Sequence, residues 1–185
     1  MEWPRHCFKA YDIRGFSGSE IDHNFAYRLG QAYAEYLGCK TIAVGRDIRE
    51  SSPILAKSLI EGLTSSGVKV LDIGIVSTGC LYHACWTLPV DGGIMITASH
   101  LPMPTHNGFK MCRGNLPLAG EEIQELMQVF LAGKFSEGEG EHVDYPHVYT
   151  YLDAIVASTG KPSRPMRVAV DCGNAVPGKA MVELL

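Results

Sequence analysis

The sequence predicts an α/β protein with a mixed, largely parallel sheet covered by helices on both faces. Short runs rich in isoleucine and valine alternate with helical patterns, and glycine, proline and serine separate the two kinds of segment. Hydrophobic residues make up 46% of the 185-residue chain, which is enough for a buried core. Because strands that alternate with helices are joined by right-handed crossovers, most neighbouring strands are expected to be parallel.

The first helix is predicted over residues 21–37, where apolar side chains recur at four-residue steps. Ser19 can cap its start, and Gly38 stands where a left-handed residue commonly ends a helix. Residues 41–45 (TIAVG) follow as a short strand. Ser51-Ser52-Pro53 then predicts the start of a second helix, with a hydroxyl cap and a proline in the first turn.

The alternation continues beyond the second helix. That helix is expected to end at Gly67, after an apolar face formed by Ile54, Leu55, Leu59, Ile60 and Leu63. Further strands are predicted at residues 68–73, 93–97 and 109–112, and further helices at residues 78–88 and 123–131.

The composition changes at residues 136–145, which hold four acidic residues and two glycines. This segment is predicted to be an acidic linker after a first domain of residues 1–135. Beyond it, a helix is predicted at 146–159 and a strand at 167–171, followed by a loop and a last helix. Because these elements are too few to bury a core alone, residues 146–185 are expected to begin a second α/β domain of a longer protein.

Charge and cysteine spacing argue against several other classes of protein. The formal net charge of −4 is unfavourable for a dedicated nucleic-acid binder, which needs clustered lysine and arginine. Neither a signal peptide nor a bilayer-spanning apolar run is evident, so a cytoplasmic protein without membrane contact is expected. Six scattered cysteines without a CxxC pair are typical of reduced thiols.

Polar clusters follow the predicted strands. Residues 45–52 (GRDIRESS) come directly after the first strand, and residues 97–100 (TASH) follow the third strand before residues 107–110 (NGFK). A further cluster, residues 11–15 (YDIRG), is expected in an N-terminal turn. Ligands of doubly wound sheets bind beyond the carboxyl ends of the strands, so the first two clusters lie where a site is expected.

Ser99 is the candidate nucleophile, because a serine on a loop after a strand can be exposed to a ligand while the sheet holds it. His100 and Lys110 are candidates to move its proton, and Arg14 and Arg46 are candidates to neutralise an anion. A phosphorylated serine carries about −1.5 to −2 charges at neutral pH and needs such cations or a metal nearby. These residues suit phosphoryl transfer, whereas the GxSxG motif of serine hydrolases is absent.

The same segments resemble the landmarks of a known family. Residues 8–15 (FKAYDIRG) look like the opening signature of the α-D-phosphohexomutases, the phosphomannomutase/phosphoglucomutase family. Residues 45–52 resemble its second landmark, residues 97–110 resemble its phosphoserine loop, and residues 171–178 (DCGNAVPG) resemble the start of its second domain. The resemblance implies an isomerase that acts as an intramolecular phosphotransferase, with this chain as its N-terminal part.

The resemblance also implies roles for individual residues. Ser99 would donate a phosphate to a hexose monophosphate and recover the other phosphate of the bisphosphate intermediate, and its phosphate oxygen would bind Mg²⁺. Lys110 would act as general base or acid, while Arg14 and His100 would stabilise the transferring group. A hexose 1,6-bisphosphate would be the activator.

Supporting residues and departures from the family pattern complete the prediction. Arg46 and Tyr11 are expected to support substrate binding. The chain reads Ser99-His100-Leu101-Pro102 where the family usually has SHNP, and the run to Asn107 is one residue longer. Phe109 in NGFK resembles the mannose/glucose branch of the family more than the glucosamine branch.

Three alternatives remain open at this point: phosphoglucosamine mutase, a non-catalytic domain that binds sugar phosphates, and a serine hydrolase. Most Mg²⁺ ligands are expected from a third domain of the family, so residues 1–185 alone are expected to lack mutase turnover. The expected partner is a hexose phosphate, and the chain could associate with itself through an exposed interdomain surface.

Overall fold

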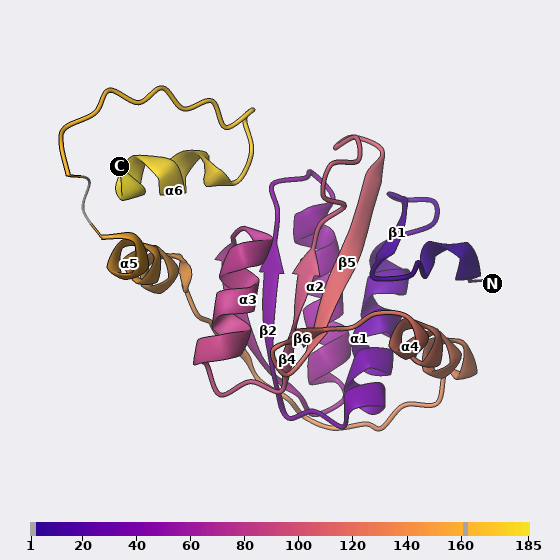
Figure 1. The fold of residues 1–185 in the computed structure, drawn as a ribbon. Helices are drawn as coiled ribbons and strands as arrows, with labels where there is room; N and C mark the ends of the chain where they lie inside the picture. The colour runs from indigo at the N-terminus through magenta and orange to yellow at the C-terminus, as the bar shows by residue number, and fades with distance from the viewer. Residues whose placement is uncertain (1–2, 161–162) are drawn as a thin grey trace.

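The computed structural model describes residues 3–160 and 163–185 and contains one sheet with the strand order β1-β5-β4-β2-β3-β7, in which β6 also pairs with β5 (Figure 1). In chain order the elements are η1 (Arg5–Cys7), β1 (Ile13–Phe16), α1 (His23–Leu37), β2 (Thr41–Arg46), α2 (Ser52–Thr64), β3 (Lys69–Ile75), α3 (Thr78–Thr87), β4 (Gly92–Ile96), β5 (His106–Arg113), β6 (Leu116–Pro117), α4 (Glu121–Ala132), β7 (His142–Asp144), α5 (Val148–Thr159) and α6 (Pro177–Leu184).

The sheet is mixed, as the sequence predicts. Strand β2 pairs in parallel with β3 and β4, and β7 pairs in parallel with β3. Strand β5 runs antiparallel to β4, β1 and β6. Strand β1 was expected as a turn, but its four residues pair with β5 across a long sequence separation. The α/β prediction is confirmed.

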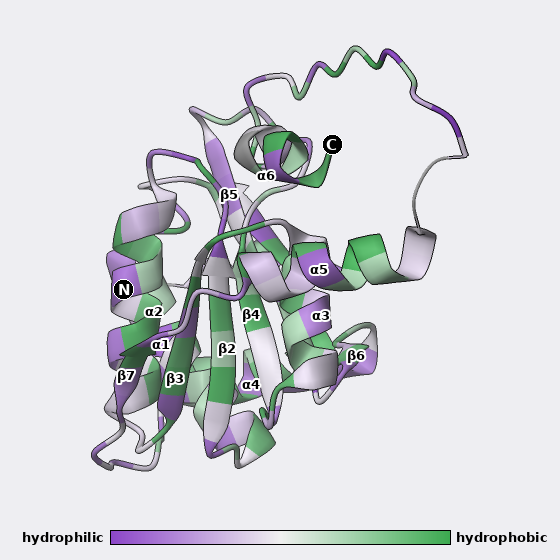
Figure 2. Ribbon diagram, turned by 90° about the vertical axis from the view of Figure 1, so that its left-hand side faces the viewer, coloured by the Kyte–Doolittle hydropathy of each residue, from purple (hydrophilic) through white to green (hydrophobic). Residues whose placement is uncertain are grey.

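Helices cover both faces of the sheet (Figures 1 and 2). Helices α1, α2 and α4 share the larger hydrophobic core with one face, while α3 packs on the other face with a smaller core. Helices α1 and α2 approach closely at Gly30 and Gly62, where an added Cβ would collide with backbone atoms of the other helix. Small residues therefore set the distance between these two helices.

The helix ends differ in part from their predictions. Asp22, rather than Ser19, is the N-cap of α1, and its Oδ1 accepts a hydrogen bond of 2.8 Å from the Phe25 amide. Gly38 ends α1 in the left-handed conformation, as expected. Ser51 occupies the N-cap position of α2, but its hydroxyl makes no capping bond, and α2 ends at Thr64 before Gly67. A carboxylate one residue before the helix outcompetes the more distant serine.

The acidic segment is exposed, as expected for a linker, but it is not free of the domain. Residues 142–144 form β7 at the edge of the sheet, with Val70 paired with His142 and Asp72 with Asp144. The Gly138 and Gly140 amides also donate to carbonyls of Ser65 and Thr64. At Gly138 and Gly140 the backbone of this segment lies so close to the backbone of residues 64–68 that only glycine fits. The glycines therefore allow the segment to dock on the domain, although its acidic side chains are solvated.

The C-terminal segment confirms its two predicted helices but not its strand. Helices α5 and α6 are present, whereas residues 167–171 are extended and exposed without a strand partner among the residues that the structure describes. Because these residues are exposed, water can satisfy their backbone groups, and a strand ladder forms only where a neighbouring strand is available.

The cysteines are free thiols, in agreement with the predicted reduced state. Burial raises the pKa of the Cys39 thiol to about 12 and that of Cys80 to about 11, so both stay protonated at neutral pH. Within residues 3–160 and 163–185, no helix is both long enough and apolar enough to cross a membrane.

A histidine pair connects α5 to α3. His83 Nδ1 lies 2.9 Å from His147 Nε2, and Tyr151 packs against His83. His147 is buried at the start of α5. Burial, together with the neighbouring His83, lowers the pKa of His147, because a buried imidazolium loses its hydration.

We expect the stability contributed by this pair to depend on pH. Since the pKa of folded His147 lies below its ordinary value of 6.5, the contribution is complete above pH 6.5 and falls as pH drops below it, where the unfolded chain binds the proton first. Urea unfolding is measured at about pH 7.5 and about pH 5.5. Between these pH values the free energy of unfolding should fall less in His147→Gln than in the unchanged chain. Equal losses in both proteins would contradict this expectation.

Candidate functional site

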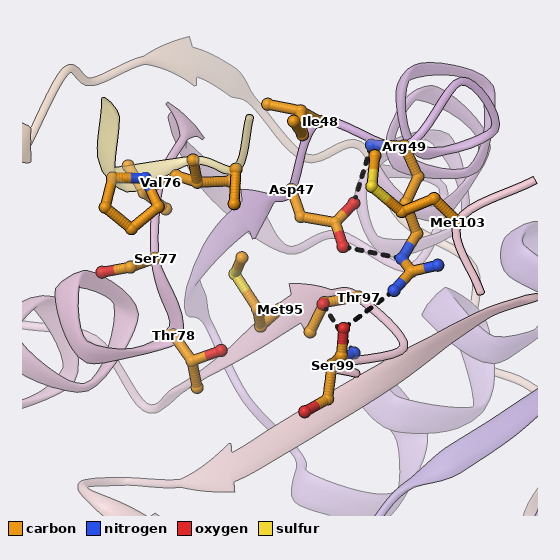
Figure 3. Close-up of a pocket in the computed structure, with 13 residues that line it drawn as sticks. Asp47, Ile48, Arg49, Val76, Ser77, Thr78, Met95, Thr97, Ser99 and Met103 are labelled. Carbon is orange, nitrogen blue, oxygen red and sulfur yellow. Dashed lines mark hydrogen bonds and ion pairs between the residues drawn. The ribbon is translucent and has the colours of Figure 1, made fainter. Parts of the chain in front are cut away.

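A cavity of about 180 Å³ lies at the carboxyl ends of the central strands (Figure 3). Ser99 and Thr97 line it from the segment after β4, and Asp47 and Arg49 line it from the segment after β2. The N-terminal end of α3 and residues 175–177 complete its wall. The cavity therefore occupies the edge of the sheet where the sequence predicts a ligand site.

Ser99 stands in an unusual backbone conformation. Its φ of 58° is in the left-handed region, one of two such non-glycine residues in the described part of the chain. Its amide donates to Thr97 Oγ1 at 3.0 Å, and its exposed hydroxyl lies 3.5 Å from His100 Nδ1. A left-handed serine costs free energy and persists only where its surroundings hold it.

Arg49 is the main support of the Ser99 loop. Its Nη2 donates at 2.9 Å to the carbonyls of Ser99 and Leu101, and its Nη1 donates at 3.1 Å to the carbonyl of His106. Its Nε donates at 2.9 Å to Asp47 Oδ2. One side chain, only 2% exposed, thus connects both ends of the loop.

A buried polar network continues from Arg49 to Asn107 at the start of β5. Ser52 donates its hydroxyl hydrogen to Asp47 Oδ1 at 2.6 Å. Asn107 Nδ2 donates to the hydroxyls of Ser51 and Ser52 at 2.8 and 3.0 Å. Ser51 does not cap α2 because its backbone is already helical, with φ −82° and ψ −15°, whereas a capping serine is extended. The segments 45–52 and 97–110 are therefore held together by side chains of both.

Two cationic side chains share one carboxylate beside this network. Asp12 Oδ2 accepts hydrogen bonds from Arg14 Nε at 2.8 Å and from Lys110 Nζ at 2.9 Å. Asp12 is 1% exposed, and its other oxygen, Oδ1, has no hydrogen-bond partner in the described part of the chain. The exposed Tyr11 ring lies 5.8 Å from the Arg14 guanidinium and 5.4 Å from Lys110 Nζ. Arg14, Lys110 and Tyr11 thus form one group around Asp12.

The strand register connects this cation group to the Ser99 loop. Arg14 pairs with Gly108 between β1 and β5, and the Thr97 amide donates to the Gly108 carbonyl. The residues Arg14, Gly108 and Thr97 therefore follow one another across three neighbouring segments. The YDIRG, NGFK and TASH clusters lie side by side at the same edge of the sheet.

Arg46 has a different environment from the other predicted site residues. Its Nη1 donates to both carboxylate oxygens of Asp72 on β3, at 2.9 Å each. His142 also lies beside Asp72, with its Nε2 3.6 Å from Asp72 Oδ2. Arg46 therefore faces the β3–β7 side of the sheet, while Arg49, three residues later, reaches the Ser99 loop.

Sequence reasoning missed Arg49, Asp12 and Asn107 as site residues. All three lie in the clusters that the sequence singles out, so their position was visible but their role was not. A signal for Arg49 and Asp47 was available, since both are charged residues directly after a buried strand. The choice between Arg46 and Arg49 required knowledge of which loop each side chain faces.

The described residues do not provide a complete metal site at Ser99. Within residues 3–160 and 163–185, the only groups of three close metal-ligating side chains are His6, Cys7 and Glu20, and Asp72, His142 and Asp144. Neither includes a residue that lines the cavity. Asp47, whose carboxylate lines the same cavity, is bound to Arg49 and Ser52. The protein side chains around Ser99 therefore do not fit a Mg²⁺ ion by themselves.

Comparisons with known proteins show the family of the chain. A family model described as phosphoglucomutase/phosphomannomutase, alpha/beta/alpha domain I, matches residues 5–137. A phosphomannomutase of Vibrio cholerae is 39% identical over 96% of this chain, and a phosphoglucomutase of Neisseria gonorrhoeae is 42% identical over 94% of it. The chain spans 40% and 38% of the length of these two relatives.

A solved structure shows the same fold. The crystal structure of a phosphoglucomutase/phosphomannomutase family protein from Burkholderia thailandensis superimposes with a TM-score of 0.92 at 35% identity. The superposition covers 99% of this chain and 42% of the Burkholderia chain. With a family model over most of its length and this structural match, the chain belongs to the phosphoglucomutase/phosphomannomutase family.

Proposed function

We propose that this chain carries the phosphoserine site of a hexose-phosphate mutase, with Ser99 as the residue that accepts and returns the phosphate. One observation supports this most: an exposed serine hydroxyl, on a backbone held in a left-handed conformation, lies at the sheet edge that also carries Arg14 and Lys110. Positioning and charge compensation are the main requirements of phosphoryl transfer.

The proposed step moves one phosphoryl group. The Ser99 Oγ attacks phosphorus of a hexose 1,6-bisphosphate, the bond from phosphorus to the sugar oxygen breaks, and a hexose monophosphate leaves. His100 is placed to receive the hydroxyl proton, because its Nδ1 lies 3.5 Å from Ser99 Oγ. The reverse step returns the phosphate to the other position of the sugar and completes an isomerisation.

Arg14 and Lys110 supply positive charge for the transferred group. Asp12 orients Arg14, so little freedom of this side chain is lost when an anion binds, and it keeps Lys110 close by. Lys110 is also the proposed general acid or base toward the sugar oxygen, a role that requires it to exchange Asp12 for substrate. Tyr11, exposed beside both cations, and Arg46 are proposed to support substrate binding.

The proposed substrates are mannose and glucose phosphates. The relatives reported above are a phosphomannomutase and a phosphoglucomutase, and the NGFK segment resembles this branch more than the glucosamine branch. A phosphate oxygen on Ser99 would supply one ligand for Mg²⁺, and the remaining ligands would come from outside this chain. Full turnover is therefore proposed for a longer protein of the cytoplasm, not for residues 1–185 alone.

Intact-mass and peptide mass spectrometry test this proposal. The chain is incubated with glucose 1,6-bisphosphate and, separately, mannose 1,6-bisphosphate in the presence of Mg²⁺. One phosphate is expected on Ser99, none is expected in Ser99→Ala, and Ser158→Ala, an exposed serine on α5, should behave like the unchanged chain. Free hexose monophosphates should not be interconverted by the 185-residue chain.

Two other outcomes would select the alternatives. Inorganic phosphate that shifts the NMR signals of Arg14, Ser99 and Lys110 without covalent phosphate on Ser99 would favour a sugar-phosphate-binding domain. Labelling of Ser99 by a fluorophosphonate probe would favour a serine hydrolase. We expect the phosphate-induced shifts and no fluorophosphonate label.

A further inference from the structure

One buried side chain holds the loop that carries Ser99. The loop leaves β4 after Ile96 and enters β5 at His106. Arg49 donates hydrogen bonds to carbonyls at both ends, those of Ser99 and Leu101 near its start and that of His106 at its end. The loop is therefore closed by a guanidinium as well as by the sheet.

The geometry of these bonds requires an arginine. A guanidinium presents five N–H groups in a fixed plane, and four hydrogen bonds from Nε, Nη1 and Nη2 are made here. Asp47 Oδ2 accepts the Nε bond, so the buried charge has a partner, and Ser52 fixes Asp47 in turn. A lysine has one nitrogen at the end of a flexible chain and cannot reach the same carbonyls together.

The bonds of Arg49 act on Ser99 directly. Ser99 is left-handed, with φ 58°, and one of the carbonyls bound by Arg49 is its own. Because the Ser99 carbonyl is held, the ψ angle of Ser99 is restricted, and with it the direction in which its Cα–Cβ bond points. Although Arg49 lines the cavity, its side chain is only 2% exposed and four hydrogen bonds from its N–H groups go to protein oxygens, so its main role is to hold the loop.

We infer that Arg49 is the positioning residue of Ser99: its guanidinium holds the serine in its left-handed conformation by joining both ends of the loop to Asp47. The inference rests on the proposed function for the reaction that Ser99 performs, but its conformational part does not. Arg46 of the same segment, which the sequence analysis expects to support substrate binding, is bound to Asp72 and makes no contact of this kind with the loop.

Amide hydrogen exchange tests the conformational part. The amides of Ser99, Leu101 and His106 donate within the loop, to Thr97 Oγ1, the Ala98 carbonyl and the Pro102 carbonyl, and can be followed individually. In Arg49→Lys we expect these amides to exchange at least about tenfold faster, equivalent to about 1.4 kcal/mol, while amides of β2 and β3 keep their rates.

Arg28→Lys is the matched control. Arg28 also donates to backbone carbonyls, those of Phe130 and Leu131, but on the α1–α4 side of the molecule. Its replacement should leave exchange at Ser99, Leu101 and His106 unchanged. A similar acceleration in both variants would show a general loss of stability and would overturn the inference.

Phosphorylation and chemical rescue test the functional part. The initial rate of phosphate transfer from glucose 1,6-bisphosphate to Ser99 should fall at least about tenfold in Arg49→Ala. Added guanidinium ion, at concentrations that do not unfold the unchanged chain, should restore part of the rate and of the loop protection. Rescue would support positioning, because a general loss of stability is not repaired by a denaturing cation.

The outcomes separate the two proposals. Absence of phosphate on Ser99 in the unchanged chain would count against the proposed function, while faster loop exchange in Arg49→Lys alone would still establish the conformational role. Loop exchange that stays unchanged in Arg49→Lys, or exchange that rises equally throughout the sheet, would overturn the inference. The inference would also be weakened if guanidinium changed neither the rate of phosphate transfer nor the exchange protection of the loop in Arg49→Ala.

Discussion

Asp12→Asn should lower the free energy of unfolding by about 3 kcal/mol, because it removes the carboxylate shared by two cations. The amide keeps the shape of the side chain but loses its charge. Its oxygen can still accept from Arg14 and Lys110, but its NH₂ group then takes the buried position of Oδ1, where the described residues offer no hydrogen-bond partner. Both cations are partly accessible to water, so solvent moderates the loss below the upper end of what a fully buried pair would show. Urea unfolding at neutral pH measures this change.

Inorganic phosphate should reverse part of the loss in Asp12→Asn. With the carboxylate removed, the two cations have no counterion, and an anion that binds only the folded state stabilises it. Phosphate should therefore raise the unfolding midpoint of Asp12→Asn more than that of the unchanged chain. An equal effect in both proteins would show that Arg14 and Lys110 do not form an anion site.

Asp22→Asn provides the control for charge. It removes the same charge from the N-cap of α1, where asparagine caps a helix about as well as aspartate. We expect a change within about 0.5 kcal/mol and no particular response to phosphate. A loss as large as that of Asp12→Asn would attribute both effects to net charge.

Phe25→Ala should lower the free energy of unfolding by about 4 kcal/mol. Phe25 is fully buried on α1 and packs against Phe8, Phe109 and Phe130, with ring centroids between 4.8 and 6.2 Å apart. The substitution removes apolar contacts with β5, with α4 and with the residue that follows η1, and it leaves a cavity that the surrounding rings cannot all fill. Thermal unfolding followed by circular dichroism should show a midpoint lower by about 10 °C.

Tyr149→Ala is the matched control for this substitution. Tyr149 is an aromatic residue on α5 with an exposed side chain, and alanine is favourable in a helix. The midpoint should change by no more than about 2 °C. A comparable fall in both variants would mean that the α1 core is less tightly packed than its contacts indicate.

The strands show which elements can be predicted from sequence patterns and which cannot. Four apolar runs at 41–45, 68–73, 93–97 and 109–112 correspond to β2, β3, β4 and β5, because buried strands must be apolar whatever their neighbours. Strand β1 has only four residues and lies in a polar motif, so no periodicity identifies it. Its partner is β5, about a hundred residues later, and a pairing at that distance is decided by tertiary packing.

In the candidate site too, the sequence identified the segments, whereas the contacts between them depended on the tertiary structure. The clusters around Arg14, Arg46, Ser99 and Lys110 were recognisable, since charged and hydroxyl residues directly after apolar strands are conspicuous in sequence. Which side chains share a partner was not recognisable. Arg14 and Lys110 meet on Asp12 although 96 positions separate them, because β1 and β5 are neighbours.

The amino-acid sequence alone determined the α/β class, the order of most helices and strands, and the edge of the sheet at which Ser99 stands. These properties depend on burial and on local backbone preferences, which are written into consecutive residues. The tertiary structure decided that Arg49 supports Ser99, that Arg46 binds Asp72, and that the acidic segment joins the sheet. Such choices depend on distances between segments remote in sequence, where two neighbouring arginines look alike until their partners are in place.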